Sequence, residues 1–425
     1  MEFLSLWLGT TDPIAIWTCV AAVVLGLYMA WTIGANDVAN AMGTSVGSGS
    51  LKYHQAILVA AVMEFAGATL AGSHVTNTIR KGIIDPQIFA GDPQVLILGM
   101  LAVLLASALW LHLSTFLGLP VSTTHSVVGA VVGFGIFACG ASQIQWAAVL
   151  RIGMSWVVSP LVGGLLAFGL FHFIRRSILH SRDPAAATLR IAPPFAGLTV
   201  AILVLAIIYE GLHNLHLNFT LLQSLLIAIP AGGIVWAIFF FIIRKRSQIG
   251  LNDIDRVESI FVALQIITAA YVAFAHGAND VANAVGPVAA VIMMTTKGMV
   301  VAETSVPMWI LVLGGIGILA GLATWGYKVM RTVGKAITEL TPTRGFCAEF
   351  STATVVLVCS KLGLPMSTTH TLVGSVLGVG LARGIDAINL RVVRSILSSW
   401  LLTVPAAGGL SVAIYYILQI LSSHL

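Results

Sequence analysis

The chain has 425 residues, of which 58% are hydrophobic and only 9% are charged. Soluble domains carry roughly 25% charged residues, so this composition excludes an ordinary water-soluble protein. The formal net charge of +5 does not indicate a nucleic-acid partner, because the basic residues lie in short segments between apolar runs and form no stripe. The four cysteines have no metal-ligand spacing and are expected to be small buried thiols.

About twelve apolar runs approach the roughly 20 residues that a membrane-spanning helix needs. Residues 1–13 contain no Lys or Arg, so a basic signal-peptide region is missing and the first run is expected to remain as a span. Two Gly-rich segments, 36–48 and 280–296, are expected to be broken or re-entrant pieces. The predicted spans lie near 14–33, 55–75, 94–115, 118–137, 143–173, 194–213, 219–243, 257–276, 307–329, 346–362, 364–383 and 391–420.

The distribution of Lys and Arg predicts the orientation in the membrane. The linkers 174–193 and 244–256 are rich in basic residues and are separated by two spans, so both are expected in the cytoplasm. Counting spans outward from them puts the N- and C-termini on the outer side. Arg80 and Lys81 do not fit, because this scheme places them outside. The sequence thus predicts a multi-pass protein of the plasma or inner cell membrane.

Two duplicated motifs are the strongest internal signal. Gly-Ala-Asn-Asp-Val-Ala-Asn-Ala at 34–41 recurs unchanged at 277–284, and Gly-Leu-Pro-x-Ser-Thr-Thr-His at 118–125 recurs at 363–370. The offsets nearly agree, at 243 (277 − 34) and 245 (363 − 118). Since the first half enters the membrane from outside and the second half from the cytoplasm, the two copies are expected to be inverted. Inverted repeats are an architecture of secondary transporters.

The predicted fold class is therefore an all-α integral membrane protein with an inverted-topology repeat and broken or re-entrant helices. We divide it into a first inverted repeat at 1–173, a linker with two extra transmembrane helices at 174–256, and a second inverted repeat at 257–425. Substrate sites in such folds lie near the midplane, where the halves meet.

The first motif predicts a cation site. It places a carboxylate and two amides at membrane depth, where such groups are costly and usually functional. Their oxygens, with freed backbone carbonyls, suit hard cations such as Na⁺, Mg²⁺ or Ca²⁺. The alternative is that the amides join helices by polar contacts. The candidate ligands are Asn36, Asp37, Asn40, Asn279, Asp280 and Asn283.

The second motif predicts an anion site. Gly-Leu-Pro ends one helix and favours the start of another, which puts Ser-Thr-Thr at a helix N-terminus. Free N–H groups, the positive end of the helix dipole and hydroxyls bind anions there without Lys or Arg. The alternative is ordinary capping of a buried helix. The candidate residues are Ser122, Thr123, Thr124, Ser367, Thr368 and Thr369.

Four other residues in apolar runs carry chemistry. His125 and His370 end the two copies of the second motif. Each could orient a hydroxyl or sense pH, or could simply be a histidine of the core, and we do not include them in the primary site. Glu64 and Glu349 are not counterparts in the repeat. Each could bind a cation, carry a proton or pair with a basic group, for which Arg151 and Lys361 are the candidates.

The two motif pairs resemble those of the inorganic phosphate transporter (PiT) family, and the resemblance runs from about Ile14 to Gly409. It implies import of orthophosphate by symport, with Na⁺ in one branch and H⁺, including metal–phosphate complexes, in another. A homodimer is also compatible with this family. The linker at the centre is short, unlike that of Na⁺-coupled animal members, so regulation through a long loop is not expected.

The resemblance marks Asp37 and Asp280 as essential acids, and Glu64 and Glu349 as transport glutamates of the Na⁺-coupled branch. The stretch at 78–84 is also similar to that branch, which favours sodium. No P-loop sequence is present, so transport is expected to run on a gradient.

We therefore expect a secondary active symporter that imports inorganic phosphate with sodium ions, using no cofactor besides the co-transported Na⁺. Cations beside HPO₄²⁻ would screen a charge that is prohibitive to bury alone, and this mutual dependence would be the coupling. Proton-coupled uptake of phosphate or metal–phosphate is the main alternative, followed by sulfate transport and a passive anion channel. A membrane enzyme is disfavoured, because no nucleophile–base pair or dinuclear cluster is evident.

Overall fold

The computed structural model describes residues 11–72, 82–209, 219–246, 253–298, 300, 306–361 and 366–423. Within these residues the regular structure is helical, and the single β-bridge joins Ile84 and Ile144. The α-helices are α2 (Pro13–Gly47), α3 (Tyr53–Ala71), α5 (Pro93–Phe116), α6 (Thr123–Cys139), α7 (Trp146–Ile174), α8 (Pro184–Tyr209), α9 (Leu221–Arg246), α10 (Asp253–Lys297), α11 (Met308–Trp325), α12 (Tyr327–Arg331), α13 (Pro342–Lys361), α14 (Thr368–Arg383) and α15 (Leu390–Ser422). Short 3₁₀ or π turns are η1 (Pro86–Phe89), η2 (Ala141–Gln143), η3 (Arg175–Leu179), η5 (Thr332–Ala336) and η6 (Ile385–Ala387).

Nine of the described helices are long and apolar enough to cross a membrane. The other three predicted runs coincide with α6, which is shorter, and with α13 and α14, which fall outside that group. The prediction of an all-α, multi-pass membrane protein is confirmed. Arg80, Lys81 and most of the stretch 78–84 lie outside the described residues.

The Gly-rich segments do not form separate pieces, contrary to our expectation. Segment 36–48 continues α2 without a break to Gly47, and 280–296 lies inside the 45-residue helix α10. The glycines that open the two motif copies, just before these segments, permit close helix approach. A Cβ on Gly34 would overlap the backbone of Ile318 in α11, and one on Gly277 would overlap the backbone of Glu64 in α3.

Helices α5 and α6 form a hairpin, and α13 and α14 form a second one. The first turn uses Gly118 at a positive φ of 69°, a conformation that favours glycine. Ser122 then caps α6 by accepting a hydrogen bond from the His125 N–H at 3.3 Å, and Ser367 caps α14 from the His370 N–H at 3.1 Å. Both helices thus begin at the Ser-Thr-Thr run, as the motif predicted. The Gly-Leu-Pro of the second copy, 363–365, lies outside the described residues.

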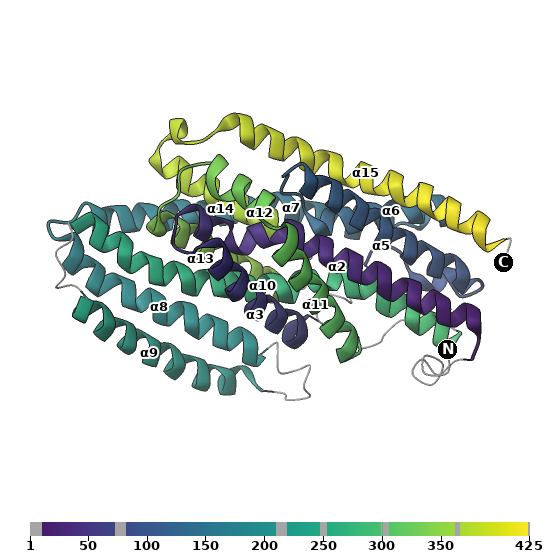
Figure 1. The fold of residues 1–425 in the computed structure, drawn as a ribbon, viewed down its shortest axis with the longest axis horizontal. Coiled ribbons are helices and arrows are strands. Elements are labelled where there is room, and N and C mark those ends of the chain that lie inside the picture. Colours follow the sequence, from purple (N-terminus) through teal and green to yellow (C-terminus); the bar gives the residue numbers. More distant parts are fainter. Residues whose placement is uncertain are drawn as a thin grey trace.

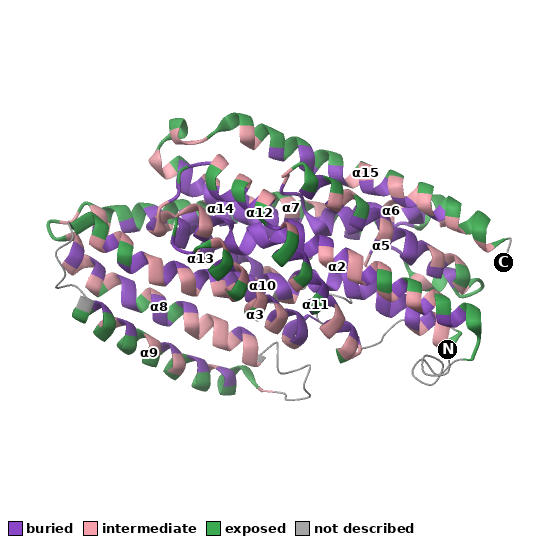
Figure 2. Cartoon of the chain, viewed as in Figure 1, coloured by how far each residue is buried: buried purple, intermediate pink, exposed green. Residues whose placement is uncertain are grey.

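Helices that correspond through the duplicated motifs make corresponding contacts. Helix α2 packs on α11 and α10 packs on α3, while α6 packs on α15 and α14 packs on α7. The central helices α2, α10 and α14 are largely buried, whereas α9 and α15 expose much of their surface (Figure 2). Helices α8 and α9 lie side by side along one edge of the molecule, with α15 along the opposite edge (Figure 1).

Candidate functional site

The two motif acids meet the ends of both hairpin helices. Asp37 and Asp280 are each 1% exposed, on α2 and α10. The Thr123 hydroxyl, at the start of α6, donates to Asp37 Oδ2, and the Thr369 hydroxyl, at the start of α14, donates to Asp37 Oδ1 at 3.2 Å. The Thr368 hydroxyl donates to Asp280 Oδ2 at 2.9 Å. Residues from both copies of both motifs therefore form one buried centre.

The two hairpin tips also contact each other directly. The Thr124 hydroxyl donates to the Met366 carbonyl at 3.3 Å, and the Thr369 hydroxyl donates to the Val121 carbonyl at 3.3 Å. Two helix N-termini, each with unpaired N–H groups and a positive dipole end, thus lie together in the protein interior. Ser122 and Ser367 cap these helices, so their side-chain oxygens already have the capping role that was the alternative for this motif.

His276 lies at the centre of the acids and was missed by the sequence analysis. Its Nε2 is 2.8 Å from Asp280 Oδ2 and 3.9 Å from Asp37 Oδ2, and its Nδ1 is 3.3 Å from Glu64 Oε1. Neither ring nitrogen of His276 forms a hydrogen bond in the described structure. The signal was a difference between the motif copies, because His276 precedes the second copy where Ile33 precedes the first.

The basic group beside Glu64 is therefore His276 and not Arg151. Arg151 is exposed near the start of α7, whereas Glu64 is fully buried on α3. The Lys361 side chain lies outside the described residues. Glu64 joins the motif acids, so three carboxylates surround one imidazole in the buried interior.

Three amide oxygens near the acids are buried without a hydrogen-bond partner in the described structure: Oδ1 of Asn40, Asn279 and Asn283. The Asn40 amide nitrogen donates to Asp37 Oδ1 at 3.0 Å and to Thr369 Oγ1 at 2.8 Å. The Asn279 amide nitrogen donates to Asp280 Oδ1 at 3.0 Å. A buried acceptor without a donor is costly, so these oxygens are suited to coordinate a cation.

Asn36 is placed differently from its predicted role as a cation ligand. Its amide nitrogen donates to Thr115 Oγ1 at 2.9 Å and to the Leu119 carbonyl at 3.1 Å. Its amide oxygen accepts from the Val121 N–H at 3.2 Å. Both ends of the side chain are thus engaged by the turn between α5 and α6, and Asn36 holds the hairpin tip against α2.

Glu349 forms a second polar centre, on α13. Its Oε1 accepts from the Thr44 and Ser45 hydroxyls, both at 2.6 Å, and from the Gln265 amide at 3.1 Å. Its Oε2 accepts from the Thr268 hydroxyl at 2.7 Å. Thr44 follows Asp37 by seven residues on α2, which separates the two centres by about 10 Å along the helix.

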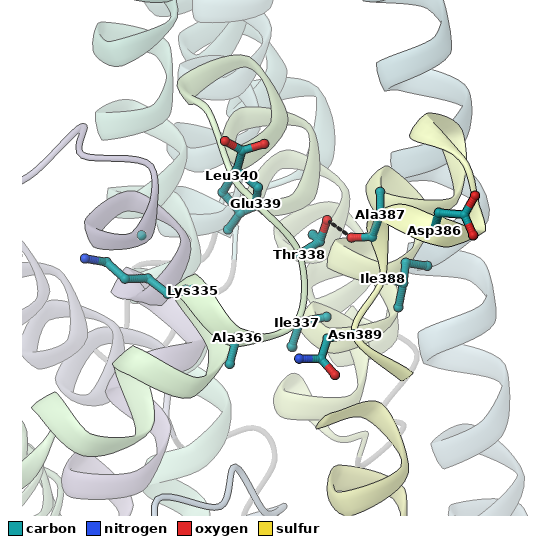
Figure 3. A pocket seen from close by; sticks show the side chains of 12 residues that line it. Lys335, Ala336, Ile337, Thr338, Glu339, Leu340, Asp386, Ala387, Ile388 and Asn389 are labelled. Atoms are coloured by element: carbon teal, nitrogen blue, oxygen red, sulfur yellow. Dashed lines mark hydrogen bonds between the residues drawn. The ribbon is translucent and has the colours of Figure 1, made fainter. Parts of the chain in front are cut away.

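A pocket of about 440 Å³ lies beyond this second centre, beside Gly47 at the end of α2. Figure 3 shows its wall, which consists of the segment from Lys335 to Leu340 and, facing it, the segment from Asp386 to Asn389. The Thr338 hydroxyl joins the two segments by donating to the Ala387 carbonyl at 2.8 Å. Asp37 is about 15 Å away along α2, so the pocket does not contain the motif acids.

Nine of the described helices are long enough to cross a membrane, and the fold encloses buried acids and two helix N-termini. This combination is typical of a membrane transporter. The chain belongs to the phosphate transporter family, whose family model matches residues 33–411.

Similar proteins agree with this membership. The chain is 50% identical over 398 residues to a putative phosphate permease of Pyrococcus abyssi, covering 94% of this chain and 97% of that one. It is 44% identical over 422 residues to the chloroplastic inorganic phosphate transporter 2-1 of Arabidopsis thaliana, covering 92% and 70%. A solved structure, a sodium-dependent phosphate transporter, superimposes with a TM-score of 0.89 at 43% identity, covering 95% and 99%.

Proposed function

We propose that this protein is a secondary active symporter that imports inorganic phosphate together with sodium ions. The observation that carries the proposal is the joining of Asp37 and Asp280 to the N-termini of α6 and α14 through Thr123, Thr368 and Thr369. Cation ligands and anion ligands are thereby in direct contact.

Phosphate would bind at the two helix N-termini, which supply N–H groups and hydroxyls without any basic side chain. In the structure three threonine hydroxyls donate to the acids. When sodium ions take the carboxylate oxygens, these hydroxyls become free to donate to phosphate. Cation and anion would each prepare the site for the other, which is the coupling that symport needs.

Sodium as the coupling ion is supported by the donor set and by the solved neighbour. The candidate ligands are carboxylate and amide oxygens, which are the hard donors that Na⁺ prefers. The neighbour at 43% identity is named a sodium-dependent phosphate transporter. Glu349, with its hydroxyl and amide neighbours, would offer a further cation position about 10 Å from the acids.

We further propose the inverted repeat, with the repeats at 1–173 and 257–425 and the linker at 174–256. The corresponding packing of α2 on α11 and α10 on α3 supports it. The start of α2 and the end of α15 lie at the same end of the molecule (Figure 1), in line with both termini on the outer side.

Proton-coupled phosphate uptake is the second candidate. It is favoured by His276, an imidazole buried among three carboxylates, because such a group can exchange protons within the site. Sodium and proton coupling make opposite predictions for the same uptake measurement.

The test is uptake of ³²P-phosphate into liposomes that carry the purified protein, under an inward Na⁺ gradient or, in choline, an inward H⁺ gradient. Sodium symport predicts accumulation that needs Na⁺ and collapses with a sodium ionophore. Uptake driven equally by protons would replace sodium with the second candidate. No phosphate uptake under either gradient would refute the substrate, and ³⁵S-sulfate would be measured next.

A further inference from the structure

Four aromatic side chains are stacked directly behind the threonines of the two hairpin tips. The His125 ring lies on Trp156 with centroids 3.6 Å apart, and the His370 ring lies on Trp400 at 3.5 Å. The two imidazoles meet edge to face at 4.2 Å. His125 and His370 are 3% and 4% exposed. We call these four residues the ring cluster.

The ring cluster crosses between two tightly packed helix pairs. Helix α6 is in tight contact with α15, since a Cβ on Gly129 would overlap the backbone of Val404. Helix α14 is equally tight against α7, where a Cβ on Gly374 would overlap the backbone of Pro160. The stacks cross between these pairs, because the histidine of α6 lies on the tryptophan of α7, and the histidine of α14 on that of α15.

Two hydrogen bonds reinforce these helix pairs, one in each pair. His370 Nδ1 lies 3.1 Å from the Trp156 carbonyl, and because a carbonyl only accepts, this nitrogen carries the proton. The Trp400 indole N–H donates to the Pro120 carbonyl at 3.0 Å. Pro120 is two residues before Ser122, the cap of α6. This bond therefore ties the tip of the first hairpin to α15.

The cluster is asymmetric, although its members correspond through the repeat. The Trp156 indole nitrogen and both ring nitrogens of His125 have no hydrogen-bond partner in the described structure. Only one tryptophan therefore donates to a hairpin tip. Replacing either tryptophan with phenylalanine is therefore the same chemical change, but only the change at Trp400 removes a hydrogen bond.

We propose that the ring cluster is a positioning device that holds the N-termini of α6 and α14 together, so that one phosphate contacts both. This inference rests on the proposed function, which places phosphate at these helix ends. His125 and His370 act through the tips and do not touch the substrate. Core packing alone would make the two tryptophans equivalent, because both stack on a histidine.

Trp400→Phe and Trp156→Phe test the proposal, since both keep a stacked ring and lose an indole N–H. A typical hydrogen bond corresponds to a factor of roughly three to ten in an equilibrium constant. Trp400→Phe is therefore expected to raise the phosphate KM by about that factor in sodium-driven uptake, with kcat and the Na⁺ half-saturation unchanged. Trp156→Phe should stay within about twofold of wild type.

His370→Asn and His370→Phe extend the test. Asparagine keeps an N–H donor close to the Nδ1 position, whereas phenylalanine keeps the ring and loses the donor. We expect His370→Asn to recover part of the phosphate affinity that His370→Phe loses. Equal KM values for the two tryptophan variants would overturn the proposal.

Hydrogen exchange of the first-turn amides of α6 and α14 supplies a readout that needs no transport. Faster exchange in Trp400→Phe than in Trp156→Phe, at equal melting temperature, is the expected result. Equal exchange in both variants would refute the positioning role even if phosphate is not the substrate. Absent phosphate uptake by the wild type would instead refute the proposed function, which separates the two failures.

Discussion

The contact of α10 with α3 can be compared with the contact of α2 with α11, because the two differ in the residues beside their glycines. In one half, Gly277 lets α10 approach Glu64 on α3, and in the other, Gly34 lets α2 approach Ile318 on α11. Each glycine is preceded by a different residue, His276 in one half and Ile33 in the other. The ionisable pair Glu64–His276, whose side chains approach to 3.3 Å, therefore corresponds in position to Ile318 and Ile33.

This difference in residue type distinguishes a contact that only packs from a contact that can also bind ions. All four side chains are at most 1% exposed, so either pair fits the same buried contact. The isoleucines gain free energy by burial alone, whereas an unpaired buried charge costs several kcal/mol. The ionisable pair lies at the acids of the site, where His276 Nε2 is 3.9 Å from Asp37 Oδ2 and 2.8 Å from Asp280 Oδ2. Asymmetry in a duplicated transporter thus marks where the cations are expected to bind.

The largest effect is expected from the acids that the two halves share. Asp37→Asn and Asp280→Asn should each reduce sodium-driven phosphate uptake at least about 100-fold, because neutral amides cannot balance the cation charge. Asp37→Asn should be the more severe, since Asp37 accepts from threonines of both hairpins and Asp280 accepts from one. The check is ³²P uptake at matched protein amounts; wild-type rates in either variant would contradict the site.

The pair Glu64–His276 can be replaced by two isoleucines, the residues found at the corresponding positions of the other half. His276→Ile leaves the buried Glu64 without its basic neighbour and should destabilise the protein by about 3–5 kcal/mol, whereas Glu64→Ile leaves His276 beside Asp280 and should cost less. The double variant should recover much of that loss, because Ile318 and Ile33 fit the equivalent contact.

Thermal melts of the two single variants, the double variant and the wild type complete a double-mutant cycle. The double variant should remain folded and yet need a higher Na⁺ concentration for half-maximal uptake. A double variant with unchanged sodium dependence would show that the asymmetry serves packing and not cation binding.

Glu349→Gln tests the second polar centre, which has no acid at the corresponding place in the first half. It keeps the shape and removes the charge that four donors surround. We expect an approximately tenfold loss of apparent Na⁺ affinity, with a smaller change in phosphate affinity, because the centre is about 10 Å from the acids. Titrations of uptake against Na⁺ and against phosphate distinguish these effects. A pure phosphate effect would argue against a cation there.

The smallest effect on stability and transport is expected from substitutions of the two isoleucines. Ile33→Val and Ile318→Val each remove one buried methylene and should cost about 0.5–1.5 kcal/mol. Sodium dependence and phosphate KM should match the wild type, because neither side chain offers a ligand. Thermal melts and uptake assays measure the two parts. Altered sodium dependence would mean that the isoleucine contact also shapes the site.

Much of the helical fold could be predicted from the sequence, because hydrophobic run length and Gly-Leu-Pro-x-Ser act locally. The helix starts at Thr123 and Thr368 follow from capping and backbone sterics, which need no tertiary information. Segments 36–48 and 280–296 were misread because glycine is also a helix breaker. Only a neighbouring helix reveals that the glycines just before these segments, Gly34 and Gly277, serve close approach.

The sequence by itself determined the membrane class, the helical fold, the duplication and the polar residues that are placed at membrane depth. These depend on composition and on short-range rules that hold wherever the chain folds. Only the tertiary structure decided which of those residues meet. It brought His276 and Glu64 to the acids, turned Asn36 toward the hairpin tip and gave Glu349 its own centre. The physical reason is that these contacts join residues far apart in the chain, whose proximity depends on how whole helices pack.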